Sequence, residues 1–285
     1  MTDTMRSAMF ESAGHMAIAD VAKPTIEQSD DAIVRVVRTC VCGSDLWPFR
    51  GINQSDDHSA NPGHEAIGIV EEVGEAITSV KPGDFVIAPF THGCGACRAC
   101  RAGYDGSCMA HNDNFTMGAQ GQFIRFQHAQ WALVKIPGKP EDYSEGMLKS
   151  LLTLSDVMAT GYHAARTARV QTGDTVIVLG DGAVGQCGII AAKMMGAKRI
   201  ISTSRHEDRR ALAQEFGATD NVAERGDEGV AKLLELSDGG ADAVLDAQIN
   251  PGKVFTQTFG LDQIQQAYEA MDQRKTIKSY LIVEG

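Results

Sequence analysis

The chain has 285 residues, 43% of them hydrophobic, and carries 37 acidic against 26 basic side chains, for a formal net charge of -11. This length accommodates one large or two ordinary domains with a full core. The acidic balance argues against nucleic acid and anionic membranes as partners, because phosphate binding requires a concentrated basic face. No apolar run reaches the length of about 18 residues that a membrane span requires, and Met1–Phe10 lacks the pattern of a signal peptide, so we expect a cytoplasmic protein.

The first half of the chain is rich in short apolar or alternating segments. Turns of Gly, Pro and Asp separate these segments, which is the pattern of strands in a small β-barrel or sandwich. The expected strands are Ala32–Val41, Ala66–Val73, Phe85–Pro89, Gln122–Gln127 and Trp131–Ile136. A helical stretch then runs from Glu145 toward Ala168.

Beyond Ala168 the pattern alternates between strands and helices, which is typical of a parallel sheet covered by helices on both faces. Strands are expected at Asp174–Leu179, Arg199–Ser204 and Asp242–Asp246, and helices at Ala183–Met195, Glu207–Phe216 and Gly229–Leu236. The tail predicts a strand at Lys253–Phe259, an amphipathic helix at Leu261–Met271 and a final strand at Ser279–Val283.

Four of the seven cysteines are bunched in one short segment, at Cys94, Cys97, Cys100 and Cys108. Two overlapping C-x-x-C steps let thiolates converge on one ion from a turning backbone, and the fourth cysteine completes a tetrahedron. Four protein ligands leave no open coordination position, so this site is expected to hold structural zinc. The alternatives are two disulfides, free thiols or an iron–sulfur cluster. Disulfides are disfavoured, because cysteines this close in sequence pair poorly and the compartment is expected to be reducing.

A second group of metal-type residues is spread over two segments, Cys42-Gly43-Ser44-Asp45 after one expected strand and Gly63-His64-Glu65 before another. A thiolate, an imidazole and one further ligand leave a coordination position for water or substrate, as catalytic zinc requires. Each segment alone is weak evidence, because a lone histidine before a strand is more often an ordinary surface or core residue.

A glycine-rich turn follows the strand expected to end at Leu179 and opens a helix, with glycines at Gly180, Gly182 and Gly185. In this context a G-x-G-x-x-G pattern is typical of dinucleotide binding. The glycines allow a tight turn and a close approach to pyrophosphate, and the helix N-terminus favours its negative charge.

The end of the next strand bears on the choice of nucleotide. An NAD site usually carries an acidic residue about 20 positions after the turn, whereas this chain has Ser204-Arg205-His206 there. Arg205 with Ser204 can hold a 2'-phosphate, and Arg209 lies one helical turn further on. We therefore expect NADP(H) to be preferred. The alternative is a solvated arginine beside two acidic residues.

Together and in this order, these segments resemble the zinc-dependent medium-chain alcohol dehydrogenase family, in its bacterial secondary-alcohol type. The resemblance also includes Leu154-Ser155-Asp156 and Ala159-Thr160-Gly161-Tyr162-His163, and it covers nearly the whole chain. It implies an α/β protein with a GroES-like β-barrel catalytic domain and a doubly wound Rossmann domain. The catalytic domain would comprise residues 1–155 and 250–285, with the zinc lobe at 93–109, and an incomplete Rossmann domain would comprise residues 156–249.

The resemblance implies roles for the metal-type residues. Cys42, His64 and Asp156 would bind the catalytic zinc, with Glu65 beside it; outside this context Asp156 would be read as a helix N-cap or a surface acid. Asp45 can accept the second ring N–H of His64 and so fix its tautomer. Ser44 would take the proton of the bound alcohol.

The resemblance also suggests walls for the substrate and contacts for the cofactor. Trp47 stands where several relatives carry a proton-relaying histidine, so the route of proton exit is unassigned. Trp47 and Phe90 are expected to line an apolar substrate pocket, or else to be ordinary core aromatics. Thr160 and Val184 should contact the nicotinamide, and Lys278 should approach the pyrophosphate.

These implications predict an oxidoreductase that interconverts an alcohol and an aldehyde or ketone with zinc and NADP(H), as a homodimer or homotetramer. The alternatives are a catalytically impaired, zinc-stabilised NADPH-binding protein and a polyol or sugar dehydrogenase. The chain is short for the family, because two strand–helix units, about 60 residues, are absent near Ala247. An omitted segment is favoured over a real deletion, since the remaining sheet would leave apolar faces uncovered.

Overall fold

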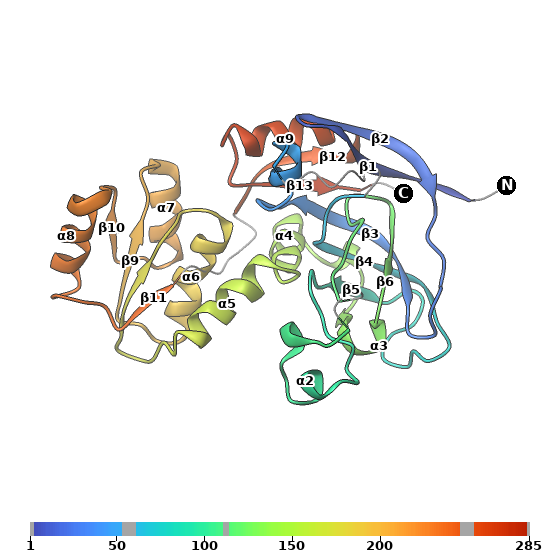
Figure 1. Cartoon of the computed structure of the whole chain (residues 1–285), viewed down its shortest axis with the longest axis horizontal. Helices are drawn as coiled ribbons and strands as arrows, with labels where there is room; N and C mark the ends of the chain where they lie inside the picture. Colours follow the sequence, from blue (N-terminus) through green and yellow to red (C-terminus); the bar gives the residue numbers. More distant parts are fainter. Residues whose placement is uncertain (1–2, 53–60, 111–113, 246–253, 284–285) are drawn as a thin grey trace. The chain divides into compact units, whose positions relative to one another are not determined.

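The computed structural model describes residues 3–52, 61–110, 114–245 and 254–283 (Figure 1). The chain forms two compact units, Met1–Asp156 with Phe255–Gly285, and Val157–Val254. The expected gap near Ala247 and the domain boundary expected at residue 250 lie outside the described residues. In the part of the chain that the structure describes, no helix is both long and apolar enough to cross a membrane.

The first unit is built on a sheet whose central strands are those that the alternating segments predict. The strand order is β12-β13-β3-β4-β5-β7, with β6 also paired to β3; β12 and β13 run parallel and the other pairs are antiparallel. Val34 and Val36 of β3 pack with Val70 of β4 and Val86 of β5 in the main core of this unit. The strands are β3 (Ala32–Val41), β4 (Ala66–Val73), β5 (Phe85–Ala88), β6 (Phe123–Phe126), β7 (Val134–Ile136), β12 (Phe255–Gly260) and β13 (Lys278–Ile282).

A hairpin of β1 (Thr4–Ser12) and β2 (His15–Ala22), which sequence reasoning missed, precedes this sheet. Both strands mix buried with half-exposed positions, so no clean alternation marks them. The helices of this unit have four to nine residues. They are α1 (Leu46–Phe49), α2 (Arg98–Arg101), α3 (Ala129–Ala132), α4 (Glu145–Thr153) and α9 (Ile264–Asp272).

The strand expected at Trp131–Ile136 is wrong in its first half. His128 adopts a left-handed φ of 53° and is the N-cap of α3, and Trp131 lies within this helix. The remaining residues, Val134–Ile136, form β7 and pair with β5.

The helix expected from Glu145 toward Ala168 is interrupted. It ends at Thr153 and resumes as α5 (Val157–Thr167). The hydroxyl of Ser155 donates to the carbonyl of Leu152 within this break. The interruption leaves Asp156 outside both helices, where its carboxylate can join a metal site.

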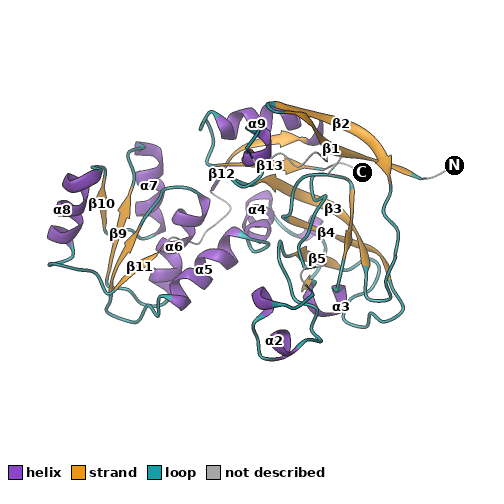
Figure 2. Cartoon of the chain, viewed as in Figure 1, coloured by secondary structure: helices purple, strands orange, loops and turns teal. Residues whose placement is uncertain are grey.

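The second unit contains a parallel sheet with helices on both faces, as the alternating pattern predicts (Figure 2). Val176 and Val178 pack with residues of α6 and α7, whereas Ile177 faces Leu233 and Leu236 of α8. The strand order is β10-β9-β8-β11, in which the three-residue β10 was not expected from the sequence. The elements besides α5 are β8 (Thr175–Val178), α6 (Ala183–Met194), β9 (Arg199–Thr203), α7 (Glu207–Phe216), β10 (Asp220–Val222), α8 (Gly226–Leu236) and β11 (Ala243–Leu245).

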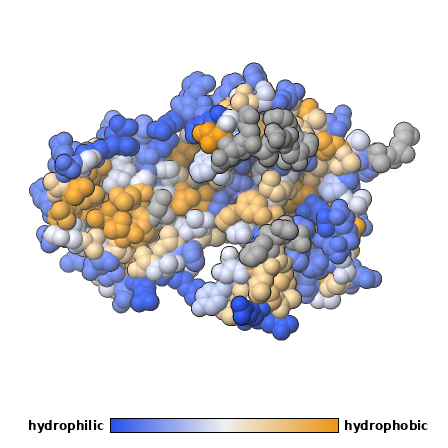
Figure 3. All heavy atoms as spheres, in the orientation of Figure 1, coloured by the Kyte–Doolittle hydropathy of each residue, from blue (hydrophilic) through white to orange (hydrophobic). Residues whose placement is uncertain are grey.

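Apolar side chains remain exposed on this second unit. Among the described strands β11 pairs only with β8, and Val244 of β11 is 54% exposed. Figure 3 shows hydrophobic side chains gathered on the surface of the unit. Apolar surface is therefore exposed at β11 of this sheet.

Candidate metal centres and nucleotide pocket

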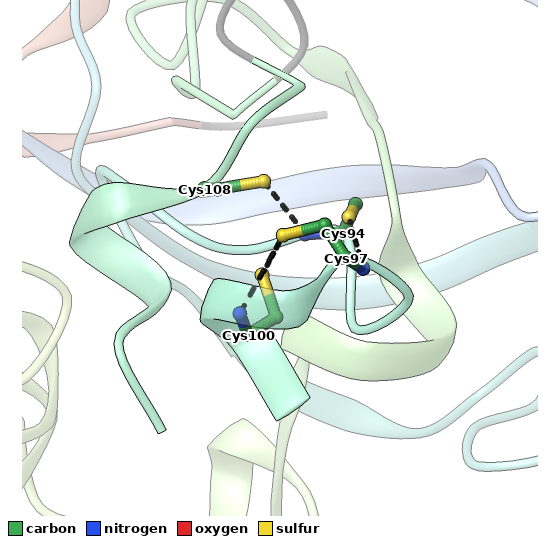
Figure 4. Close-up of side chains that lie close together, drawn as sticks. All are labelled: Cys94, Cys97, Cys100 and Cys108. Carbon is green, nitrogen blue, oxygen red and sulfur yellow. Dashed lines mark hydrogen bonds between the residues drawn. The ribbon is translucent and has the colours of Figure 1, made fainter. Parts of the chain in front are cut away.

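The four clustered cysteines lie around one point, as their spacing predicts (Figure 4). Their sulfur atoms are all within 4.8 Å of one another, and Sγ of Cys97 is 3.4 Å from Sγ of Cys100. Neighbouring sulfurs of a tetrahedral zinc site are about 3.8 Å apart, so the cluster fits one ion. The disulfide alternative is wrong, because all seven cysteines are free.

Backbone groups prepare this cluster for a metal. Hydrogen bonds from the N–H groups of Cys100 and Met109 lower the pKa of Cys97 to about 6, which favours the thiolate that binds metal. The indole of Trp131 packs against the segment that carries the four cysteines. Its Nε1 donates to Asp105 at 3.2 Å, and a Cβ added to Gly95 would lie 2.7 Å from the ring. Sequence reasoning missed this contact, because it assigned Trp131 to a strand.

Cys42, His64, Glu65 and Asp156 come together in the first unit, with one ligand atom of each within 4.8 Å of the others. Sγ of Cys42 is 3.8 Å from Oδ2 of Asp156, and Nε2 of His64 is 3.5 Å from the same oxygen. Ligand atoms around a tetrahedral zinc ion are about 3.3–3.8 Å apart. The end of β3, the segment before β4 and the break after α4 thus supply three ligands at the separations that zinc requires.

The charges around this second cluster favour a cation. Burial lowers the pKa of His64, but hydrogen bonds with Asp156 and Asp45 outweigh it and raise that pKa to about 12. Oε2 of Glu65 is buried and has no hydrogen-bond partner among the described residues. The donor set fits zinc, which Cys42, His64 and Asp156 can hold with the carboxylate of Glu65 beside them.

Lys278, which the family resemblance leads us to expect near the pyrophosphate, lies beside this cluster. Its Nζ is 2.5 Å from Oε1 of Glu65, and both side chains are only 1% exposed. Lys278 begins β13, so the C-terminal return of the chain brings it into the first unit. The structure therefore shows Lys278 in a buried ion pair with Glu65, and its contact with a pyrophosphate stays a prediction.

A series of hydrogen-bonded polar side chains begins at Nδ1 of His64, the ring nitrogen that faces away from Asp156. Oδ1 of Asp45 is 3.4 Å from Nδ1 of His64, and Oδ2 accepts from the N–H of Cys42 at 2.8 Å and from Nε2 of Gln120 at 3.1 Å. Oε1 of Gln120 in turn accepts from the hydroxyl of Tyr268 at 2.9 Å. These bonds orient the carboxylate toward the imidazole. Sequence reasoning anticipated Asp45 but had no signal for Gln120 or Tyr268.

Tyr268→Phe is expected to destabilise the first unit by about 1–3 kcal/mol, because it leaves Oε1 of Gln120 buried without its donor. Chemical denaturation of the variant and the parent measures the difference. Tyr162→Phe is the matched control, since Tyr162 is 41% exposed, and its effect should stay within about 0.5 kcal/mol. Equal losses in the two variants would contradict the role assigned to this hydrogen bond.

Aromatic rings flank the second cluster. The ring centroid of Phe90 is 6.0 Å from that of His64, and Phe115, which sequence reasoning missed, lies 5.6 Å from His64 and 5.9 Å from Phe90. Trp47 is 55% exposed, so the alternative that it is a core aromatic is wrong. Ser44 is exposed two residues beyond the Cys42 thiol. Phe90 and Phe115 thus form an apolar wall next to the metal ligands.

The glycine-rich turn has the geometry of a phosphate-binding loop. Gly180 has a φ of 100°, which favours glycine, and its N–H donates to Oγ1 of Thr203 at 3.0 Å. Gly182 is the N-cap of α6, and apart from its chain neighbours no described residue has an atom within 4 Å of a Cβ added to it. Packing within the protein therefore does not require glycine there, whereas a pyrophosphate approaching the helix N-terminus does. Gly185 is buried in the first turn of α6.

A cavity of about 340 Å³ lies beside this turn, and Asp181, Ser204 and Arg205 are among the residues that line it. Arg205 is exposed at its rim. The hydroxyl of Ser204 instead donates to Asp181 at 2.7 Å, and Arg209 pairs with the same carboxylate at 3.0 Å. The sequence predicts that Ser204, Arg205 and Arg209 surround a 2'-phosphate, and no sequence pattern singles out Asp181.

Thr160 and Val184, the two residues expected at the nicotinamide, lie on the neighbouring helices α5 and α6. Val184 packs against a small cluster of Val157, Met158 and Cys187. Both side chains are partly exposed. The structure thus leaves them accessible on the second unit.

Comparison with known proteins extends these observations. Residues 28–138 match a family model described as the alcohol dehydrogenase GroES-like domain, and residues 183–261 match that of zinc-binding dehydrogenases. The zinc-type alcohol dehydrogenase-like protein AdhB of Bacillus subtilis is 36% identical over 272 residues, which cover 90% of this chain and 70% of that protein. Zinc-type alcohol dehydrogenase B of Aspergillus flavus is 33% identical over 253 residues, which cover 85% of this chain but only 58% of that protein.

Solved structures share the fold. The alcohol dehydrogenase of Thermus sp. ATN1 superposes with a TM-score of 0.81 at 24% identity, covering 98% of this chain and 100% of its own. An NADP-bound zinc-binding dehydrogenase of Sinorhizobium meliloti gives a TM-score of 0.73 at 21% identity, covering 98% and 99%. A GroES-like domain and a Rossmann-type domain therefore account for the architecture.

Proposed function

Because this chain belongs to the zinc-dependent medium-chain alcohol dehydrogenase family, we propose that it interconverts an alcohol with an aldehyde or ketone by hydride transfer, preferring NADP(H). The observation that supports this most is the convergence of Cys42, His64 and Asp156 at metal-binding separations. The chain spans 58% to 70% of the two curated relatives described above, so the activity of the whole is part of the proposal.

The residues of the first unit have distinct tasks in this proposal. Zinc, when bound by Cys42, His64 and Asp156, supplies Lewis-acid polarisation of the substrate oxygen, and the nicotinamide supplies hydride chemistry. Ser44 accepts the hydroxyl proton as the alcohol is oxidised and returns it during reduction. Asp45 holds His64 in the tautomer that leaves Nε2 free for the metal. The four-cysteine lobe has no open position, so its task is structural.

Arg205→Ala is expected to raise the KM for NADP+ about tenfold or more and to leave that for NAD+ nearly unchanged. A hydrogen bond to a charged group contributes about 1.5–3 kcal/mol, and about 1.4 kcal/mol corresponds to a factor of ten. The two KM values are measured from turnover of a panel of primary and secondary alcohols with each nucleotide. Arg166→Ala removes the same charge from an exposed position on α5 and is the control. A parent enzyme that prefers NAD+, with the same preference in Arg205→Ala, would contradict the proposed choice of nucleotide.

A further inference from the structure

Asp181 is one of the residues that line the nucleotide cavity in the second unit. It projects from the turn between β8 and α6, where its Oδ2 accepts from Ser204 at 2.7 Å and its Oδ1 from Arg209 at 3.0 Å. The Asp181 side chain is 22% exposed and that of Arg209 only 12%. A negative charge is thus fixed next to the last residues of β9, although β9 itself ends without an acidic residue.

This negative charge persists at neutral pH. Burial raises the pKa of Asp181, but the hydrogen bond from Ser204 and the charge of Arg209 outweigh this effect and bring the pKa below its ordinary value. Both carboxylate oxygens have a donor, and the geometry of the ion pair holds them in place. Asp181 is therefore a fixed anion and not a group that protonates to admit a phosphate.

Two of the three donors expected to bind a 2'-phosphate are engaged by this carboxylate. Ser204 gives its hydroxyl hydrogen to Asp181, and the charge of Arg209 is offset by it. Among the described residues Arg205 makes no ion pair, so its guanidinium remains available at the cavity. A 2'-phosphate would be attracted by the guanidinium of Arg205 but repelled by the like charge of Asp181.

We propose that Asp181 is a specificity-determining residue that limits the preference for NADP(H): its carboxylate engages Ser204 and Arg209 and opposes a 2'-phosphate that Arg205 attracts. In NAD(H) the 2'-position carries a hydroxyl, which a carboxylate accepts from and does not repel. The balance between Arg205 and Asp181 then sets the ratio of the two nucleotides. This inference rests on the proposed NADP(H) preference, and it extends that preference to a second residue.

Direct titration of NADPH and NADH into the zinc-loaded protein tests the inference without requiring turnover. Asp181→Asn keeps the size of the side chain and removes its charge, so that a 2'-phosphate no longer meets a carboxylate and Arg209 no longer has an anionic partner. The ratio of NADPH to NADH affinity should rise about 10- to 100-fold, as expected for one or two charge-assisted hydrogen bonds gained. Asp181→Ser, which is also neutral, should raise the ratio in the same direction and serves if the asparagine variant folds poorly.

Asp238→Asn is the matched control, because it removes the same charge at an exposed position near Arg199, at the opposite end of β9. Its affinity ratio should equal that of the parent. An unchanged or lower ratio in both neutral Asp181 variants would overturn the inference. A parent that prefers NADH regardless of Arg205, while the Asp181 variants still gain NADPH affinity, would instead refute the proposed preference and leave the role of Asp181 intact.

Discussion

His64→Ala is expected to remove one of two zinc ions per chain and to lower alcohol turnover at least about 1000-fold. The variant leaves Cys42 and Asp156 without the imidazole that lies 3.5 Å from the Asp156 carboxylate. Loss of metal-assisted charge stabilisation costs several kcal/mol in the transition state, which corresponds to this factor. Metal analysis of the purified chain, together with turnover under saturating alcohol, measures both effects.

The two metal centres should respond independently to this change. The four cysteines of the lobe share no ligand with the second cluster, so one zinc ion per chain should remain in His64→Ala. His15→Ala is the matched control, because His15 is exposed on β2, and it should keep both ions and full turnover. A His64→Ala chain without any zinc, or with two ions and normal turnover, would contradict the assignment of separate structural and catalytic centres.

Ser44→Ala is expected to lower kcat about 100- to 10,000-fold with little change in KM or zinc content, because it removes a positioned proton acceptor. Ser44 is exposed two residues after Cys42, and among the described residues its hydroxyl makes no hydrogen bond that would give it a structural task. Ser44→Thr retains a hydroxyl at this position and should restore most of the activity. Normal kcat in Ser44→Ala would show that another group or water takes the proton.

Local spacing explains what could be predicted from the sequence. The four lobe cysteines lie within 15 residues, so their convergence follows from the turns between them, and the glycines of the nucleotide turn likewise act through the local backbone. The strands and helices with clear periodicity were also confirmed. The strand expected at Trp131–Ile136 was wrong in its first half because His128, just before it, has a positive φ and precedes a short helix. The sign of φ at a single residue cannot be predicted from an apolar segment.

Contacts between distant parts of the chain explain most of what could not be predicted. Lys278 pairs with Glu65 across 213 positions, and Tyr268 donates to Gln120 across 148. Such partners are brought together only by the tertiary fold, which periodicity does not determine. Asp181 was missed for another reason: it occupies a variable position of the glycine motif, and only the structure shows its carboxylate directed at Ser204 and Arg209.

Cobalt replacement of zinc at the second cluster tests whether the alcohol binds there, since the visible spectrum of cobalt reports the ligands around it. Cys42, His64 and Asp156 leave a coordination position open, whereas the four cysteines of the lobe leave none. In a chain that holds cobalt at the second cluster, the spectrum should change when an alcohol is added together with NADP+, and the change should be absent in His64→Ala. A spectrum that alcohols leave unchanged, with cobalt bound and nucleotide present, would contradict an alcohol-binding catalytic centre.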